Sequence, residues 1–350
     1  TLLPDQIFKC VEPRYLEEPR AQWIGRGGIL ALPETTKHVS ELLKAANSFS
    51  VGVVPYGGGT GLVGGQTFPN DPSPLIISLE RMSSIRKIFL HENVLIAEAG
   101  TILANVQRAA TKEGRLFPLS LAAEGSARIG GNLATNAGGI NVLRYGTARD
   151  LCIGLEAVLP DGSIWNGLSR LRKDNTGYDL KNLLIGSEGT LGIITAAALK
   201  LYPEPSTYGT AFLKVESPEA ALGLLSLARS QVGEAISAFE LINEQGFHFL
   251  KETLPNVRQP FEKVPEWAVL VELGLGPNID GQIALENIFE SALEQGFLTG
   301  GLIAQSEGQR QEFWSVREHI PEANRLIGSI SSHDISLPLS VVPKFISKAN

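Results

Sequence analysis

The sequence is short of cysteine: its 350 residues contain only Cys10 and Cys152. Two cysteines are too few for a disulfide framework or a cysteine zinc site, so we expect both to be small buried residues in a reducing compartment. Positive charge is also in deficit, with 30 Lys and Arg against 37 Asp and Glu and a net charge of −7. Without an excess of basic residues, nucleic acid and anionic lipid are not expected partners.

Long apolar runs are missing as well. No stretch of the sequence approaches the ~18 residues of a membrane span, so we expect no transmembrane segment. Residues 1–22 lack the basic start and apolar centre of a secretory signal. We therefore expect a cytoplasmic protein, or one of the mitochondrial matrix if the source is a eukaryote. The sequence opens at Thr1 without Met and stops at Asn350, and we expect further sequence at both ends.

Glycine, by contrast, is abundant, and many of the 37 glycines fall in three bursts, at residues 55–66, 118–139 and 186–195. The overall composition, 43% hydrophobic and 19% charged, is that of a globular protein. Apolar spacing around the bursts predicts a mixture of helices and strands. The predicted helices cover residues 39–46 and 102–112, and the predicted strands cover residues 51–55, 75–79, 85–89, 94–97, 155–159 and 191–199.

Two prolines in residues 202–206 interrupt this pattern, because proline continues neither a helix nor a central strand. We place a domain boundary there, between residues 1–205 and residues 206–350. Beyond the boundary, predicted strands alternate with predicted helices. The strands cover residues 211–215, 235–242, 268–273 and 302–306, and the helices cover residues 218–231, 244–254, 283–295 and 309–326.

The first burst, PYGGGTGLVGGQ, can direct several backbone N–H groups at one anion, and a pyrophosphate would fit it. A nucleoside-triphosphate loop would need Lys and Ser or Thr after its last glycine, where the sequence offers Leu62 and Gln66. A dinucleotide fingerprint would need an acidic residue ~20 positions further on, which is not found at the end of a clear strand. A glycine-rich turn without a ligand stays open as the alternative for this burst.

The second burst adds hydroxyl and amide side chains, which can bind a polar ligand without charge. The third leads directly into an apolar strand. Three such loops, with no metal-ligand cluster and no paired catalytic carboxylates, indicate a shared binding site better than separate turns do. The five histidines lack the spacing of a metal site; they are His38, His91, His248, His319 and His333.

Four motifs carry a resemblance to a known family: PYGGGTGLVGGQ, IGGNLATNAGG, RYGTARD and LRKDNTGYDLKNLLIGSEGTLGIIT. They resemble the flavoenzymes of the vanillyl-alcohol oxidase fold, most closely the D-2-hydroxyacid dehydrogenase branch with its D-lactate, glycolate and D-2-hydroxyglutarate dehydrogenases. The resemblance is strong over about residues 20–205 and looser over residues 206–345. It implies an α+β fold: a two-subdomain PCMH-type FAD-binding domain over residues 1–205, then an α/β cap domain with an antiparallel sheet over residues 206–350, which closes the substrate side.

The resemblance also assigns cofactor contacts. The first burst would wrap the FAD pyrophosphate with Pro55, Gly57, Gly58, Gly59, Thr60, Gly61 and Leu62. The second would line the flavin and ribityl chain with Pro118, Ser120, Gly125, Ser126, Ile129, Gly130, Asn132, Thr135, Asn136 and Gly138. The third would face the adenosine half or the isoalloxazine edge with Glu188, Gly189, Gly192 and Ile193. Because the first two bursts contain no His or Cys for a covalent link, we expect non-covalent FAD.

For the substrate, the resemblance assigns Arg317 to the carboxylate, with which a planar guanidinium forms a bidentate pair. The alternative is a solvated arginine paired with Glu318 or Glu322. Where the D-2-hydroxyglutarate enzymes have a second cation, this sequence reads Ser-Ser-His at residues 331–333, and Pro321 replaces a hydroxyl residue. Both departures argue against 2-hydroxyglutarate and favour a different or smaller hydroxyacid.

The family's distal histidine-rich segment, which binds a metal and supplies the base in several members, has no counterpart in this sequence. The base and any divalent metal are therefore expected outside the chain, with His333 as a weak candidate for the base. The implied activity is FAD-dependent oxidation of a 2-hydroxyacid to the 2-oxoacid, by hydride transfer to flavin N5, with an unidentified electron acceptor and a homodimer as one assembly. Two alternatives stay open: a flavin-containing transferase of the alkyl-dihydroxyacetonephosphate synthase type, or the FAD-carrying subunit of a larger oxidase.

Overall fold

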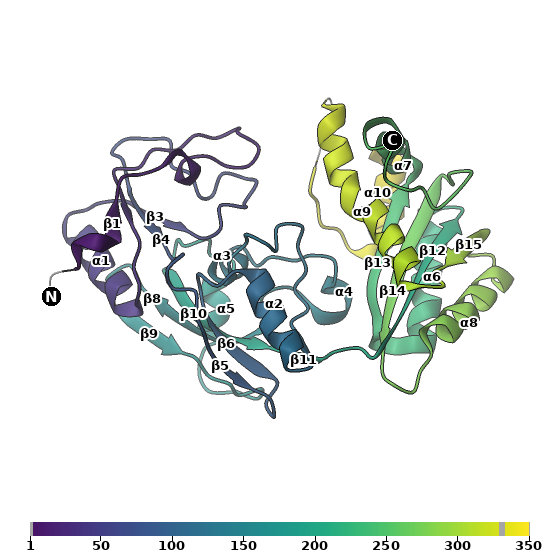
Figure 1. Ribbon diagram of the computed structural model, residues 1–350, viewed down its shortest axis with the longest axis horizontal. Coiled ribbons are helices and arrows are strands. Elements are labelled where there is room, and N and C mark those ends of the chain that lie inside the picture. Colours follow the sequence, from purple (N-terminus) through teal and green to yellow (C-terminus); the bar gives the residue numbers. More distant parts are fainter. Residues whose placement is uncertain (1–2, 329–332, 350) are drawn as a thin grey trace. The chain divides into compact units, whose positions relative to one another are not determined.

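The computed structural model describes residues 3–328 and 333–349, which form two compact units (Figure 1). Unit 1 comprises Thr1–Asn141 and Tyr145–Glu204, and unit 2 comprises Val142–Arg144 and Pro205–Asn350. The three residues Val142–Arg144 belong with unit 2 because Arg144 donates a hydrogen bond from Nη1 to the carbonyl oxygen of Gly274, at 2.7 Å. Nothing in the sequence indicated that these three residues join the second unit.

The four-stranded sheet of unit 1 is mixed and has the strand order β1-β2-β4-β3. Strands β2 (Ile29–Ala31) and β3 (Val53–Tyr56) both run parallel to β4 (Leu75–Ser78), and β1 (Phe8–Lys9) is antiparallel to β2. Helix α1 (Thr36–Ser48) connects β2 to β3, as a parallel crossover requires. The Thr35 side chain caps this helix by accepting from the His38 N–H.

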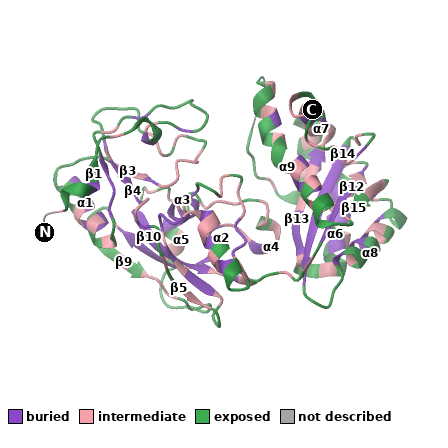
Figure 2. Ribbon diagram, in the orientation of Figure 1, coloured by how far each residue is buried: buried purple, intermediate pink, exposed green. Residues whose placement is uncertain are grey.

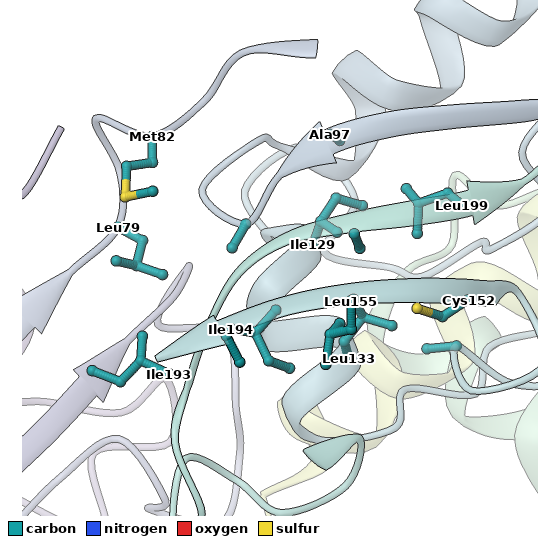
Figure 3. Packing of buried hydrophobic residues seen from close by; sticks show 14 of the residues in the cluster. Leu79, Met82, Ala97, Ile129, Leu133, Cys152, Leu155, Ile193, Ile194 and Leu199 are labelled. Carbon is teal, nitrogen blue, oxygen red and sulfur yellow. The ribbon is translucent and has the colours of Figure 1, made fainter. Parts of the chain in front are cut away.

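The larger sheet of unit 1 is antiparallel, with the order β5-β6-β10-β8-β9. Its strands are β5 (Ile85–Phe89), β6 (Val94–Glu98), β8 (Cys152–Val158), β9 (Ile164–Gly167) and β10 (Ile193–Lys200). The central strand β10 is buried except at its last residue, because α3 (Ile129–Ala134) packs on it. Figure 3 shows this core, in which Ile129 and Leu133 of α3 lie near Leu155 and Ile194 of the sheet.

Unit 2 is built on one antiparallel sheet with the order β13-β14-β12-β15. Its strands are β12 (Thr207–Val215), β13 (Ile236–Asn243), β14 (Trp267–Leu275) and β15 (Gly300–Ile303). Helices α6 (Pro218–Val232) and α8 (Gly281–Glu294) bury their apolar residues against one face. On the other face, the Phe212 ring of β12 packs at a tilt against Phe247 of α7 (Glu244–Thr253) and edge-to-face against Phe313 of α9 (Glu307–Ile327).

Burial follows these layers: the central strands of both units are mostly buried, and exposed residues lie on helix faces, loops and edge strands such as β1 and β9 (Figure 2). The remaining elements are short, apart from the helix over residues 103–112, and residues 115–116 and 202–203 pair as a two-stranded antiparallel sheet. These elements are η1 (Asp5–Ile7), η2 (Pro13–Tyr15), α2 (Leu103–Lys112), β7 (Arg115–Leu116), α4 (Val142–Tyr145), α5 (Leu180–Leu184), β11 (Tyr202–Pro203), η3 (Gly233–Ala235), η4 (Leu339–Val341) and α10 (Val342–Ala349). No helix in the described part of the chain combines the length and apolar character that a membrane span requires.

The α+β prediction is confirmed, including the antiparallel sheet in the second half of the chain. Two smaller predictions are wrong. Strand β15 covers Gly300–Ile303 and not residues 302–306, because its glycines approach β12 closely: a Cβ at Gly301 would lie 2.9 Å from the Phe212 carbonyl oxygen. Cys10 is exposed, since it lies in the irregular chain after the edge strand β1, whereas Cys152 is buried in β8 as expected.

Candidate functional site

The first two glycine bursts lie directly against each other in unit 1. A Cβ at Gly57 would lie 3.3 Å from the Cα of Gly131, so the two backbones are in van der Waals contact. A Cβ at Gly58 would overlap the Ser126 carbonyl oxygen and lie 3.1 Å from the Cα of Ala127. Only glycine permits this approach of two chain segments that are more than sixty residues apart.

The third burst closes on the other two. Gly189 has φ +81°, and a Cβ there would lie 2.7 Å from Cγ of Pro55, at the start of the first burst. Glu188, itself at φ +51°, donates its backbone N–H to the Ala134 carbonyl oxygen at the end of α3, at 2.9 Å. The structure thus brings together all three segments that the sequence singled out.

A group of hydrogen-bonded side chains lies next to the first burst. The Tyr56 hydroxyl donates to the carbonyl oxygen of Arg14 at 2.8 Å, and Gly59 can turn over this hydroxyl only because it has φ +68° and no Cβ. Arg14 donates from Nη2 to the Tyr15 hydroxyl at 2.8 Å, and Tyr15 donates to Glu80 at 2.9 Å. Burial and the bond to Glu80 raise the pKa of Tyr15 to about 12, so Tyr15 keeps its proton and remains a donor.

Asn132 is the observation that points to a ligand. Its side chain is on α3, 5% exposed, next to the contact between the first two bursts. Within the described residues, its Nδ2 group has no hydrogen-bond acceptor. A buried amide donor without a partner is costly, so the site fits a ligand that offers acceptor atoms. The glycine backbones and the Asn132 amide are neutral donors, which suits a cofactor with pyrophosphate and heteroaromatic acceptors such as FAD.

Other predicted cofactor residues are already engaged with the protein. The Asn136 Oδ1 atom accepts from the backbone N–H of Arg149 at 3.0 Å, and the Thr135 hydroxyl donates to the Gly131 carbonyl oxygen at 3.0 Å. Ile129 and Ile193 point their side chains into the core, so that only their backbone could face a ligand (Figure 3).

One residue that holds the loops of this site together was not singled out from the sequence. Arg149, in the RYGTARD motif, donates from Nη2 to the Ile185 carbonyl oxygen at 2.6 Å and from Nη1 to the Asn182 carbonyl oxygen. It therefore ties α5 to the second burst, through its backbone bond to Asn136. The motif itself was the only signal that could have identified this residue.

Arg317 lies on α9 in unit 2 with 30% of its side chain exposed. It donates from Nε to Oε2 of Glu240 on β13 at 2.6 Å, and Glu240 is neither of the two partners that the sequence offered. Of those two, Glu322 pairs with Arg325.

His333 is exposed and lies outside any regular element, and the neighbouring Ser331 and Ser332 lie outside the described residues. Among residues 3–328 and 333–349, no group of three or more His, Cys, Asp or Glu side chains could hold a metal ion.

Comparison with known proteins identifies the family. Residues 28–167 match the FAD binding domain, and residues 204–350 match the C-terminal domain of FAD linked oxidases. The chain is 34% identical over 342 residues to a D-2-hydroxyglutarate dehydrogenase of Xanthomonas citri pv. viticola, which covers 96% of this chain and 71% of that protein. The chain belongs to the FAD-linked oxidases, in their D-2-hydroxyacid dehydrogenase branch. The resemblance read from the four motifs is thereby confirmed.

Two further relatives are mitochondrial proteins. The D-2-hydroxyglutarate dehydrogenase of Bos taurus is 38% identical over 342 residues, with 97% of this chain and 62% of that protein covered. The putative D-lactate dehydrogenase of Schizosaccharomyces pombe is 37% identical over 345 residues, with 97% and 65% covered. This FAD-linked oxidase thus spans less than two thirds of the length of either relative.

Solved structures share the fold at low identity. An alkyldihydroxyacetonephosphate synthase superimposes with a TM-score of 0.72 at 19% identity, over 92% of this chain and 62% of that one. The 4-ethylphenol oxidase of Gulosibacter chungangensis superimposes with a TM-score of 0.63 at 17% identity, over 84% and 61%. The first two glycine bursts lie inside the matched FAD binding domain, and the third lies between the two matched ranges. Which part of FAD each residue contacts stays a prediction.

Proposed function

We propose that this FAD-linked oxidase binds FAD non-covalently in residues 1–205 and oxidises a 2-hydroxyacid to the corresponding 2-oxoacid. The observation that carries the proposal is the convergence of three glycine bursts beside the unpartnered Asn132 amide. When bound, FAD supplies a hydride acceptor at flavin N5. The protein's own residues hold the cofactor through backbone N–H groups and hold the substrate in the cap domain, residues 206–350.

Arg317 is the proposed anchor for the substrate. Relatives in this branch are named for D-2-hydroxyglutarate and D-lactate. These two acids share a 2-hydroxycarboxylate, so we propose that the guanidinium of Arg317 binds that carboxylate. Pro321 and the Ser-Ser-His sequence at residues 331–333 favour a hydroxyacid other than 2-hydroxyglutarate. His333 is the candidate base within the chain. The electron acceptor, a divalent metal, a homodimer and a location in the cytoplasm or mitochondrial matrix stay predictions.

The state of the cofactor is tested on the purified protein. We expect acid or heat to release all of the flavin into the supernatant, because neither of the first two bursts contains a His or Cys. A yellow colour that stays with the denatured precipitate would refute non-covalent binding.

The reaction is tested by anaerobic mixing of the flavin-loaded protein with a panel of D- and L-2-hydroxyacids. Oxidation of the substrate bleaches the flavin absorbance, and we expect this from one enantiomeric series. Arg317→Ala should lower kcat/KM on the best substrate by a factor that corresponds to about 2 to 5 kcal/mol of transition-state stabilisation, since a carboxylate loses a bidentate partner. Arg317→Lys should restore only part of that loss in kcat/KM. Because the base is expected outside residues 1–350, the screen uses the full-length protein. There, a flavin that no hydroxyacid bleaches would instead favour a transferase or a non-catalytic FAD subunit.

A further inference from the structure

Helix α9 is joined to the sheet of unit 2 by two arginine–glutamate pairs. Arg310 pairs with Glu272 on β14, and Arg317 pairs with Glu240 on β13. The two arginines are seven residues apart, so they lie on the same side of the helix. Glu272 is directly opposite Ala238 in the β13–β14 ladder, and Glu240 is two residues beyond Ala238, so both carboxylates point from the same face of the sheet.

The first of these pairs is the more buried and makes more hydrogen bonds. Glu272 is 6% exposed, and its Oε2 atom accepts from Arg310 Nε at 2.8 Å, from Trp314 Nε1 at 2.6 Å and from Thr210 Oγ1 at 3.1 Å. Arg310 uses a second nitrogen, Nη1, on Glu307 at 3.0 Å. This buried ion pair, with hydrogen bonds from Trp314 and Thr210 added to it, holds α9 on the sheet.

The second pair is only half used. Glu240 accepts at Oε2 from Arg317 Nε at 2.6 Å, and the side chains are 22% and 30% exposed. In the described part of the chain, neither Nη1 nor Nη2 of Arg317 has a hydrogen-bond acceptor. Four N–H donors of a planar guanidinium therefore remain, and two of them lie parallel on the edge away from Nε, where a carboxylate accepts both at once.

The helix itself positions Arg317 weakly. Pro321 lies inside α9, four residues after Arg317, and has no N–H to bond to the Arg317 carbonyl oxygen. The turn that carries Arg317 thus lacks one of its backbone hydrogen bonds. Because an arginine side chain also has several free rotations, the orientation of this guanidinium depends on the contact that Nε makes with Glu240.

We propose that Glu240 is the positioning residue for Arg317: by accepting the Nε proton, it holds the guanidinium with its Nη1/Nη2 edge free to receive a ligand carboxylate end-on. The inference rests on the proposed function, in that it takes Arg317 as the carboxylate anchor. Glu240 acts through Arg317 and is assigned no contact with the ligand.

The test measures binding and not turnover, with oxalate as the probe, because oxalate carries carboxylates and has no hydride to transfer. Calorimetric titration of the flavin-loaded protein with oxalate gives the Kd for oxalate. Glu240→Ala frees the guanidinium and should weaken oxalate binding about 10- to 100-fold, the size typical of lost orienting partners and small misplacements. Glu240→Gln keeps an oxygen acceptor for Nε and should stay within about 3-fold of the wild type.

Three further variants make the result specific. Glu240→Asp has a shorter side chain, so its oxalate Kd should lie between those of Glu240→Ala and Glu240→Gln. This ranking of Kd values can be tested even if Glu240→Ala is too unstable to purify. In the Glu240→Ala background, Arg317→Ala should cost no more affinity than Arg317→Ala does alone, since the two residues act as one unit. Glu272→Ala is the matched control: it removes the carboxylate of the other pair on the same helix, and it should lower Tm while leaving the oxalate Kd within about 3-fold.

The outcomes separate the two claims. If Arg317→Ala leaves the oxalate Kd unchanged, Arg317 is not the carboxylate anchor, and the proposed function loses its substrate residue together with this inference. If Arg317→Ala weakens binding but Glu240→Ala leaves it unchanged or tightens it, Glu240 competes with the ligand or is irrelevant, and only this inference is overturned. An equal loss of affinity in Glu240→Ala and Glu272→Ala would likewise overturn it, because both would then act through the stability of α9.

Discussion

The contact between the first two glycine bursts makes a specific prediction about Gly58. A Cβ there would overlap the Ser126 carbonyl oxygen and lie 3.1 Å from the Cα of Ala127, whereas ordinary contacts begin at 3.4 Å. The φ of Gly58 is not in the left-handed region, so Gly58→Ala adds no backbone strain and tests the contact alone. Both neighbours are backbone atoms, and the two bursts must therefore move apart.

We expect two measurable effects of Gly58→Ala. Forcing one extra carbon into a packed contact costs about 1 to 3 kcal/mol of unfolding free energy. At about 2 kcal/mol, this lowers the Tm of a unit of this size by about 4 to 8 °C. Displacing the binding loop by ~1 Å misplaces the backbone donors, and misplacement on that scale costs up to about 10²-fold, so the Kd for FAD should rise about 10- to 100-fold.

The assays are thermal unfolding of the apoprotein and titration of the apoprotein with FAD, followed by quenching of flavin fluorescence. Gly276→Ala is the control, because a Cβ at Gly276 has nothing within 4 Å and its φ is not left-handed. It should change neither quantity. An unchanged Tm and an unchanged FAD Kd in Gly58→Ala would show that the two bursts are not in contact, and the binding site would have to be placed elsewhere.

Two further predictions concern unit 1. Glu156 is buried, which by itself would raise its pKa, but bonds from Arg86 at 3.1 Å, Thr36 at 2.7 Å and Thr195 at 2.8 Å lower that pKa below its usual range. The stability from ionised Glu156 is therefore present above the usual glutamate pKa and lost as the pH falls through the lowered value. Urea unfolding should show that Glu156→Gln lowers the free energy of unfolding by about 3 kcal/mol at pH 7. The free energy of unfolding of the variant should also fall less steeply as the pH is lowered; an equally steep fall in both proteins would contradict this. Burial raises the pKa of Cys152 to about 12, whereas Cys10 is exposed, so a thiol reagent at mildly alkaline pH should label one cysteine in the native protein and two after unfolding. Two rapidly labelled thiols in the native protein would refute the buried position of Cys152.

The types of the long elements could be predicted from the sequence because they depend on local spacing. The apolar residues Val39, Leu42, Leu43 and Ala46 repeat with a helical period, and they form the buried face of α1. The glycine bursts were informative for a related reason, since the lack of a Cβ is a property of each residue before the chain folds. Short elements were missed where local preference was weak: α3 contains two glycines and an asparagine, and it is a helix because it packs on β10.

The contacts of the site were decided by the tertiary structure. Gly58 meets Ser126 only after the chain has folded, and Glu240 reaches Arg317 across 77 positions of sequence. The sequence indicated that Arg317 was of interest, but it offered Glu318 and Glu322 as partners, because only neighbours along a helix can be read from spacing. By itself, the sequence determined which backbones can approach closely and which faces are apolar. The packing of the sheets decided which of those surfaces meet. The hydrophobic effect depends on the total apolar area that is buried and has no direction, so an apolar face does not by itself determine which other face covers it.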